Sequence, residues 1–352
     1  MSEALSYPKN KIQIVLAEKV HTAAADVFRE AGYTVEMVPN ALEGEQLAEV
    51  VSRAHVLGVR SRTKVRAAHL ASAKRLMAVG CFSVGTDQVE LEAATSQGIP
   101  VFNAPYSSTR SVAELTLCCV IGLARKMAER SMRMHQGHWE KAVEGSFEVR
   151  DKTLGIIGYG HIGQQVGLLA ETLGMNVVFY DVVRKLPLGR ARAMHRMMDV
   201  LEASDFVTLH VFGGATTRDL MGEAELAAMK RGSHLLNLSR GSVVDLAALK
   251  AALQSKHLAG AAIDVFPTEP AAGKAPFESP LQGLDNVILS PHVGGSTEEA
   301  QRGIGAEVAT ALVSFLDSGA TEGAVNFPTV HLRPFPHAHR ILNIHRNVPG
   351  AL

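Results

Sequence analysis

A glycine-rich turn between an apolar strand and a helix constrains the fold of this chain more than any other feature. The strand is Leu154–Ile157, and Gly158, Gly160 and Gly163 follow it at the spacing Gly-x-Gly-x-x-Gly. In this arrangement the first glycine makes a tight turn, the second lets a pyrophosphate approach the backbone, and the third lets the helix pack on the strand. The start of that helix offers free N–H groups and a positive dipole end to phosphates.

A carboxylate stands where a dinucleotide would need one. Asp181 directly follows a second apolar run, residues 176–180, about 20 residues after the glycines. An acid at this position bonds the ribose 2′-hydroxyl and repels a 2′-phosphate, so the sequence favours NAD over NADP. Arg184 and Lys185 follow closely and leave that choice open.

Length and charge limit the remaining possibilities. A chain of 352 residues is too long for one compact core. Its composition, with 47% hydrophobic but only 5% aromatic residues, is typical of proteins with buried parallel strands. With 35 basic and 35 acidic residues the net charge is zero, which argues against a nucleic-acid or membrane partner.

The three cysteines predict neither a disulfide framework nor a metal site, because Cys118 and Cys119 are neighbours and Cys81 stands alone. No signal peptide or membrane-spanning stretch is visible. We therefore expect a soluble, cytoplasmic protein.

Strand-like runs alternate with helical patterns throughout, which predicts an α/β protein with two doubly wound parallel-sheet, Rossmann-like domains. The first set of strands is expected at 12–16, 34–38, 56–59, 76–79 and 99–102, with helices at 23–31, 44–52 and 91–97. The second set is expected at 154–157, 176–180, 206–210, 234–238, 261–265 and 287–289.

Two longer helices are expected to connect the domains. One runs from Ser111 to about Gln136, with Ser111 and Glu114 as a capping box, and the other covers 297–318. These helices predict a discontinuous substrate-binding domain (1–107 with 297–330), an NAD-binding domain (108–296), and an active site in the cleft between them.

Three side chains with catalytic potential follow successive strands of the second domain. Arg240 follows 234–238, Glu269 follows 261–265, and His292 follows 287–289. The fork of an arginine suits a carboxylate, and a carboxylate beside His292 would raise its pKa, as an acid–base catalyst of alcohol oxidation requires. A lone histidine is more often structural, so the residues alone leave this open.

Polar residues also follow two strands of the first domain. Arg60, Ser61 and Arg62 follow 56–59 and could clamp a phosphate or a carboxylate, although a solvated loop is about as plausible. The loop 80–87 could receive an anion on its backbone N–H groups, or be a simple tight turn.

Together these motifs resemble the D-isomer-specific 2-hydroxyacid dehydrogenase family, from about residue 8 to about residue 330. The matching segments are 85–87, 103–105, 110–115, 158–163, 239–241, 264–270 and 291–296. The pattern is most similar to members that oxidise D-3-phosphoglycerate with NAD in the first step of L-serine biosynthesis. The resemblance also implies a possible side activity on 2-oxoglutarate.

The resemblance implies individual roles. Arg240 would bind the substrate carboxylate, His292 would take the hydroxyl proton, and Glu269 would orient His292. The substrate-binding set would be Arg60, Ser61, Arg62, Ser83, Val84 and Gly85. The cofactor-binding set would be Gly158, Gly160, His161, Ile162, Gly163, Asp181, Leu238, Ser239, Arg240, Asp264, His292, Val293, Gly294 and Gly295.

The family is dimeric through its nucleotide domain, and Trp139 and Lys141 match positions near that subunit contact. Ser108 stands where the family commonly has asparagine, so one polar contact near the cleft differs. Residues 343–350 resemble the first strand of a regulatory ACT domain, and we expect 331–352 to be a poorly ordered remnant of it.

Two other functions remain open. A related dehydrogenase would act on glycerate, glyoxylate or lactate, although Arg60 and Arg62 favour a phosphorylated substrate. A non-catalytic, NAD(H)-sensing protein like the corepressors of this fold would retain Arg240, Glu269 and His292. Measuring turnover of 3-phosphohydroxypyruvate with NADH would separate these alternatives.

Overall fold

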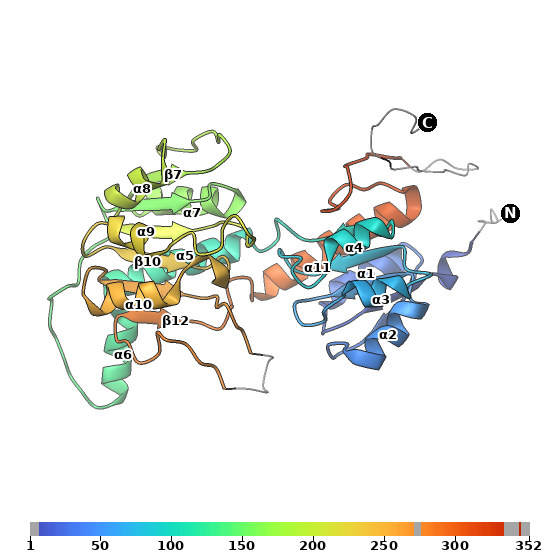
Figure 1. Cartoon of the computed structure of the whole chain (residues 1–352), viewed down its shortest axis with the longest axis horizontal. Coiled ribbons are helices and arrows are strands. Elements are labelled where there is room, and N and C mark those ends of the chain that lie inside the picture. Colours follow the sequence, from blue (N-terminus) through green and yellow to red (C-terminus); the bar gives the residue numbers. More distant parts are fainter. Residues whose placement is uncertain (1–6, 271–275, 334–344, 346–352) are drawn as a thin grey trace. The chain divides into compact units, whose positions relative to one another are not determined.

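The computed structural model describes residues 7–270, 276–333 and 345. The chain divides into two compact units (Figure 1). Unit 1 is Met1–Ser108 with Glu298–Leu352, and unit 2 is Thr109–Thr297. The predicted regulatory remnant lies largely outside the described residues.

Unit 1 is built on a five-stranded parallel sheet of order β2-β1-β3-β4-β5. The strands are β1 (Gln13–Leu16), β2 (Thr34–Met37), β3 (Val56–Val59), β4 (Ala78–Cys81) and β5 (Val101–Phe102). Strands β3, β4 and β5 are buried along their whole length, as expected for parallel strands covered on both faces. Strand β4 lies two residues later than predicted, because its register pairs Ala78 with Val56 of β3.

Helices cover both faces of this sheet. After the short turn η1 (Lys9–Lys11), helix α1 (Thr22–Glu30) packs against α11 (Glu298–Ser318) over one apolar core. The other core lies under α2 (Gly44–Arg53), α3 (Ala67–Ala71) and α4 (Leu91–Ser96). Helix α3 was not predicted; it is only five residues long.

Unit 2 contains a seven-stranded parallel sheet of order β12-β11-β10-β9-β6-β7-β8. The strands are β6 (Thr153–Ile157), β7 (Asn176–Tyr180), β8 (Arg192–Ala193), β9 (Phe206–Leu209), β10 (His234–Asn237), β11 (Gly260–Ile263) and β12 (Val287–Leu289). Successive strands run outward from β6 in one direction and then from β9 in the other. The order therefore reverses between β6 and β9, which is where open α/β sheets bind ligands.

Two helical layers enclose this sheet (Figure 1). Helices α5 (Thr109–Ala124) and α7 (His161–Thr172) pack together over one apolar core. A second apolar core lies on the opposite face. It is covered by helices α8 (Met197–Ala203), α9 (Glu223–Ala228) and α10 (Leu246–Gln254) and by the turn η2 (Gly241–Val243). The two parallel sheets confirm the predicted fold class.

The predicted helix from Ser111 to Gln136 is wrong in its bounds. The chain forms α5, then breaks at Lys126, whose φ of +52° is left-handed, and resumes as α6 (Met127–His135). Ser111 lies inside α5 and its hydroxyl contacts that of Thr297 at 2.8 Å, so the predicted capping box does not form.

Among the described residues, no helix is both long and apolar enough to cross a membrane. The same part of the chain holds no cluster of three potential metal ligands.

Candidate active site

The glycine-rich turn has the geometry that its sequence predicts. Gly158 has a φ of +91°, and a Cβ there would lie 2.3 Å from the carbonyl oxygen of His210. A Cβ on Gly163 would lie 2.3 Å from the carbonyl oxygen of Gly158, so the helix packs directly on the turn. Gly160 precedes the first residue of α7, and its missing side chain faces open space. Two glycines are therefore needed for packing, and the third leaves the helix N-terminus accessible.

Asp181 is held next to this turn by two backbone bonds. One carboxylate oxygen accepts from the N–H of Tyr159 at 2.8 Å, and the other from the N–H of Val183 at 2.9 Å. A carboxylate oxygen can accept more than one hydrogen bond, so Asp181 retains capacity for a ribose hydroxyl. An open helix N-terminus with a fixed acid beside it fits NAD.

Parallel pairing places the three catalytic candidates at one edge of the sheet. Strands β10, β11 and β12 are neighbours, and Arg240, Glu269 and His292 follow their carboxyl ends. Nδ1 of His292 lies 2.8 and 3.0 Å from the two carboxylate oxygens of Glu269. The contact assigns the Nδ1 proton to the side facing Glu269, which leaves Nε2 as the basic nitrogen of the neutral ring.

The electrostatics of this pair suit acid–base chemistry. The hydrogen bond to Glu269 raises the pKa of His292 above its usual value, against the opposing effect of burial. Burial alone would raise the pKa of Glu269, but the hydrogen bond and charge of His292 hold it below its usual value. The charge of Arg240 acts on both groups, lowering the pKa of each. The three side chains therefore form one electrostatic cluster.

Arg240 is positioned by a close backbone approach. Asn237 donates from its side-chain amide to the carbonyl of Arg240 at 2.9 Å. A Cβ on Gly241 would lie 2.0 Å from the carbonyl carbon of Phe266, so the loop carrying Arg240 touches the loop carrying Glu269. Glu269 in turn accepts from the N–H of Phe266 at 3.2 Å. Only glycine fits between these two loops.

Asp264 organises the loop that carries His292. Its carboxylate accepts from the hydroxyl of Ser290 at 2.6 Å and from the N–H groups of Val293 and Gly294, both at 2.9 Å. The carbonyl of Asp264 accepts from the N–H of His292 at 2.7 Å. His292 adopts a left-handed φ of +54°, which is uncommon for a residue with a side chain. The family resemblance placed Asp264 in the cofactor-binding set and did not reveal this role in the loop.

The remaining predicted cofactor residues lie at the same edge of unit 2. Leu238 and Ser239 are buried directly after β10, and the hydroxyl of Ser239 donates to Asn237 at 2.9 Å. His161 and Ile162 begin α7, and Gly295 follows the loop held by Asp264.

Unit 1 brings its predicted substrate residues to one sheet edge, because β3 and β4 are neighbours. Arg60 is half-buried after β3, whereas Ser61 and Arg62 are exposed. After β4, Ser83 donates its N–H to the carbonyl of Cys81 at 2.8 Å, so that group is already engaged. The N–H groups of Val84 and Gly85 donate to no group within the described chain.

Asn103 and Gln88 hold the loop after β4 in place, and Gln88 did not stand out in the sequence. The side-chain amide of Asn103 donates to the carbonyl of Val84 at 2.5 Å, and that of Gln88 donates to the hydroxyl of Ser83 at 3.0 Å. Gln88 is almost fully buried. No spacing in the sequence links it to Ser83, so only the folded loop reveals the contact.

The family of the chain follows from comparison with known proteins. Residues 117–294 match the model of the D-isomer specific 2-hydroxyacid dehydrogenase, NAD binding domain. The chain belongs to this family. It is 51% identical over 352 residues to D-3-phosphoglycerate dehydrogenase of Dictyostelium discoideum, covering 100% of the chain and 86% of that protein. It is 53% identical over 349 residues to D-3-phosphoglycerate dehydrogenase of Escherichia coli K12, covering 99% and 85%.

Solved structures of other 2-hydroxyacid dehydrogenases have the same fold. The D-lactate dehydrogenase of Aquifex aeolicus, complexed with NAD and lactic acid, is 27% identical with a TM-score of 0.79, covering 90% of this chain and 100% of that one. D-2-hydroxyisocaproate dehydrogenase is also 27% identical with a TM-score of 0.79, covering 89% and 99%. The family assignment agrees with the glycine turn, which lies within the matched NAD-binding domain.

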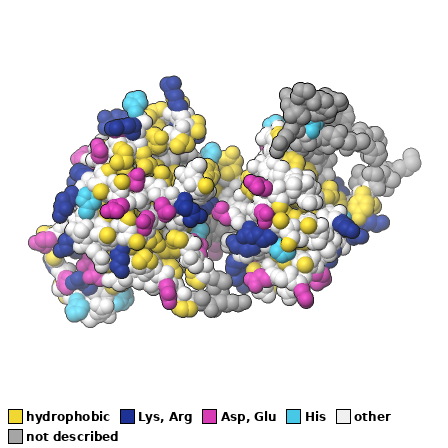
Figure 2. Space-filling model, in the orientation of Figure 1, with side chains coloured by type: hydrophobic (Ala, Val, Ile, Leu, Met, Phe, Trp, Pro, Cys, Tyr) yellow, Lys and Arg dark blue, Asp and Glu magenta, His cyan; other side chains and the backbone are white. Residues whose placement is uncertain are grey.

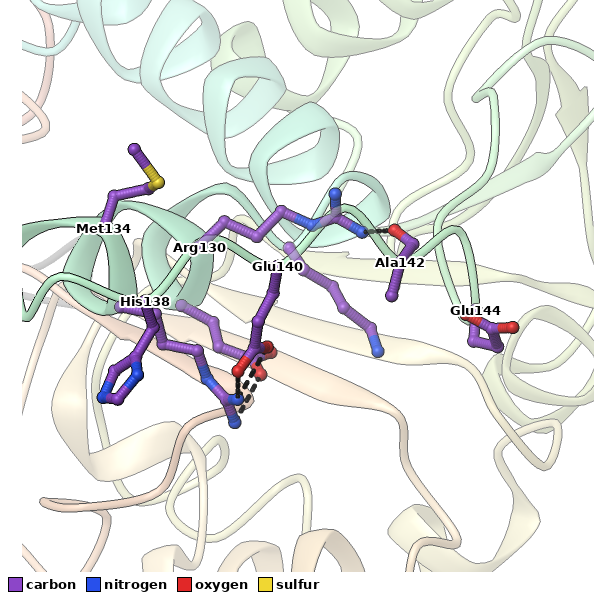
Figure 3. Close-up of a pocket in the computed structure, with 9 residues that line it drawn as sticks. Arg130, Met134, His138, Glu140, Ala142 and Glu144 are labelled. Carbon is purple, nitrogen blue, oxygen red and sulfur yellow. Dashed lines mark hydrogen bonds and ion pairs between the residues drawn. The ribbon is translucent and has the colours of Figure 1, made fainter.

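A separate hollow of this dehydrogenase lies beside α6 and the segment that follows it (Figure 3). Arg130 donates to the carbonyl of Ala142 and to the hydroxyl of Ser146, and Arg133 pairs with Glu140 at 2.7 Å. Trp139 in this segment is 80% exposed. The hollow contains none of the predicted catalytic residues.

Charged side chains of both signs are interspersed over the visible face of each unit (Figure 2). This mixture agrees with the net charge of zero. An anion site would therefore depend on individually placed basic residues rather than on the overall charge.

Proposed function

We propose that the chain oxidises D-3-phosphoglycerate to 3-phosphohydroxypyruvate with NAD, the first step of L-serine biosynthesis. The observation that carries this proposal is the His292–Glu269 pair beside Arg240, in the same unit as the glycine turn. The high identity to two D-3-phosphoglycerate dehydrogenases supports the substrate.

The residues of unit 2 provide the acid–base part of the reaction. When bound, NAD supplies the hydride acceptor. Nε2 of His292 takes the proton of the substrate hydroxyl, and Glu269 stabilises the resulting imidazolium through Nδ1. Arg240 binds the substrate carboxylate and stabilises negative charge on the oxygen that becomes the carbonyl.

The residues of unit 1 provide substrate selectivity in this proposal. Arg60, Arg62 and the hydroxyl of Ser61 bind the phosphate, and the free N–H groups of Val84 and Gly85 bind the carboxylate. The second carboxylate of 2-oxoglutarate could occupy the phosphate position, which supports a side activity on that acid.

A substrate panel tests the proposed function. The purified protein would be supplied with NADH and 3-phosphohydroxypyruvate, hydroxypyruvate, glyoxylate, pyruvate or 2-oxoglutarate, and NADH absorbance followed. We expect kcat/KM to be highest for the phosphorylated acid. A preference for an unphosphorylated acid would identify another 2-hydroxyacid dehydrogenase. Tight NADH binding without turnover of any acid would favour the corepressor-like alternative.

Glu269→Gln is expected to move the acid limb of the oxidation pH profile to lower pH. Oxidation needs the neutral imidazole as base, so kcat rises as the pH passes upward through the pKa of His292. Glu269 raises that pKa, and an amide lacks the negative charge that does so. The pH dependence of kcat would be compared with that of Glu202→Gln, a change on the exposed surface of α8. An unchanged midpoint of the pH profile would show that Glu269 does not raise the pKa of His292.

Gly160→Ala is expected to weaken NADH binding without lowering stability. The added methyl group faces open space in the protein, but it occupies the approach of the pyrophosphate, so Kd should rise roughly 100-fold, or about 2.7 kcal/mol. Calorimetric titration and thermal unfolding would measure the two effects. Gly163→Ala is the contrast, because its methyl group meets the carbonyl oxygen of Gly158 and should lower both stability and binding. Equal NADH affinity for Gly160→Ala and wild type would contradict the pyrophosphate assignment.

We further propose a homodimer formed through α6 and the segment 136–148 of unit 2. Large apolar side chains are exposed there: Met127, Met132, Met134, Trp139 and Val143. An exposed apolar cluster on a soluble protein commonly marks an interface. Sedimentation equilibrium would measure the mass directly.

The three free cysteines agree with a reducing compartment such as the cytoplasm.

A further inference from the structure

A buried carboxylate lies directly under the arginine loop of unit 1. Glu18 follows β1, the neighbour of β3 in the sheet, and is only 3% exposed. Its Oε1 accepts from the backbone N–H groups of Arg60 at 3.2 Å and Thr63 at 2.7 Å. Its Oε2 accepts from the N–H of Arg62 at 2.9 Å. One side chain therefore fixes the loop at three points.

The contacts of Glu18 suit an ionised carboxylate. An ionised carboxylate has acceptors only, and all three backbone partners are donors. The guanidinium of Arg62 adds an ion-pair contact, with Nε 3.9 Å from Oε2. Burying a charge is costly unless hydrogen bonds compensate it. The loop is therefore held by strong, directional bonds rather than by apolar packing alone.

The backbone at Glu18 has an unusual conformation. Glu18 and Lys19 have left-handed φ values of +64° and +53°. Such residues persist where the surrounding structure determines their position, and they cluster at ligand sites. The N–H of Glu18 donates to the carbonyl of Asn40 at 3.1 Å, and the hydroxyl of Thr63 accepts from the N–H of Leu42 at 3.0 Å. The segments after β1, β2 and β3 are thus tied together.

We propose that Glu18 is a positioning residue for the phosphate of the substrate. It does not touch the substrate; it sets the backbone positions from which Arg60 and Arg62 reach one anion. Binding by two arginines depends on their spacing, because the productive geometry is narrow. This inference rests on the proposed function and assigns a role to a residue that follows neither β3 nor β4.

Glu18→Gln tests this role, because it keeps the shape and removes the charge. Its amide nitrogen would face backbone donors, so one or two of the three bonds are lost. We expect KM for 3-phosphohydroxypyruvate to rise about tenfold, with kcat little changed. Turnover of hydroxypyruvate, which lacks the phosphate, and calorimetric Kd for NADH should stay at the wild-type values. A merely structural change would not distinguish the two substrates.

Glu36→Gln is the matched control, because it removes the exposed Arg53–Glu36 ion pair of the same unit and should leave both KM values unchanged. Glu18→Asp keeps the charge but is too short to reach all three N–H groups, so it should also raise KM for 3-phosphohydroxypyruvate while leaving turnover of hydroxypyruvate unchanged. This variant decides the question if Glu18→Gln does not fold. Unchanged KM for the phosphorylated acid, or equal losses on both acids, would overturn the role of Glu18. Failure of the wild-type protein to reduce 3-phosphohydroxypyruvate would instead overturn the proposed function.

Discussion

Replacing His292 by alanine should slow oxidation of 3-phosphoglycerate by roughly 100- to 10,000-fold, the usual contribution of a general acid–base group. The loss should appear in kcat, because Nε2 acts on the hydroxyl proton as the reaction proceeds. NADH affinity should change much less than kcat, because the glycine turn and Asp181 remain. Initial rates and calorimetric titration would measure the two effects separately.

The backbone of His292 requires a second variant. Its left-handed φ of +54° could relax in His292→Ala and displace the loop held by Asp264. Asparagine tolerates this conformation better than most residues, and its amide can still donate to Glu269. His292→Asn should therefore lose activity to a similar extent, with the loop unchanged. His195→Ala, an exposed histidine of unit 2, is the control, and a loss below tenfold in both His292 variants would exclude the assigned role.

The arrangement of the candidate site residues in unit 2 could be predicted because their geometry follows from local rules. Each glycine of the turn is required for a distinct steric reason, which can be inferred from the spacing alone. The structure shows the close backbone approaches behind this requirement at Gly158 and Gly163. The carboxyl ends of parallel strands meet at one edge, which is why residues separated in sequence, such as Glu269 and His292, could be expected to touch.

Other features depend on contacts that no local pattern expresses. The helical periodicity continues past Lys126, yet the backbone turns left-handed there and divides the helix. Ser111 is of a residue type that often caps helices, but it lies inside α5. Glu18 and Asp264 act through backbone N–H groups of distant residues. A sequence records side chains, so bonds to distant backbone groups stay hidden until the fold is known.

Gly241→Ala should damage both stability and catalysis, because the added methyl group has no space. A Cβ there would lie 2.0 Å from the carbonyl carbon of Phe266 and 2.5 Å from the nitrogen of Pro267. Backbone atoms cannot move aside as a flexible side chain can, so the two loops must separate. We expect a loss of about 3 kcal/mol in the free energy of unfolding, at the upper end of ordinary overpacking.

The catalytic effect of Gly241→Ala should exceed what lost stability explains. Separating the loops moves Arg240 away from Glu269 and His292, and a displacement near 1 Å can lower the rate about 100-fold. Rates would be measured well below the melting temperature, where the variant stays folded, and compared with Gly214→Ala, whose methyl group would meet no atom within 4 Å. A folded Gly241→Ala variant with wild-type kcat would mean that the contact between the Arg240 and Glu269 loops does not determine the catalytic geometry.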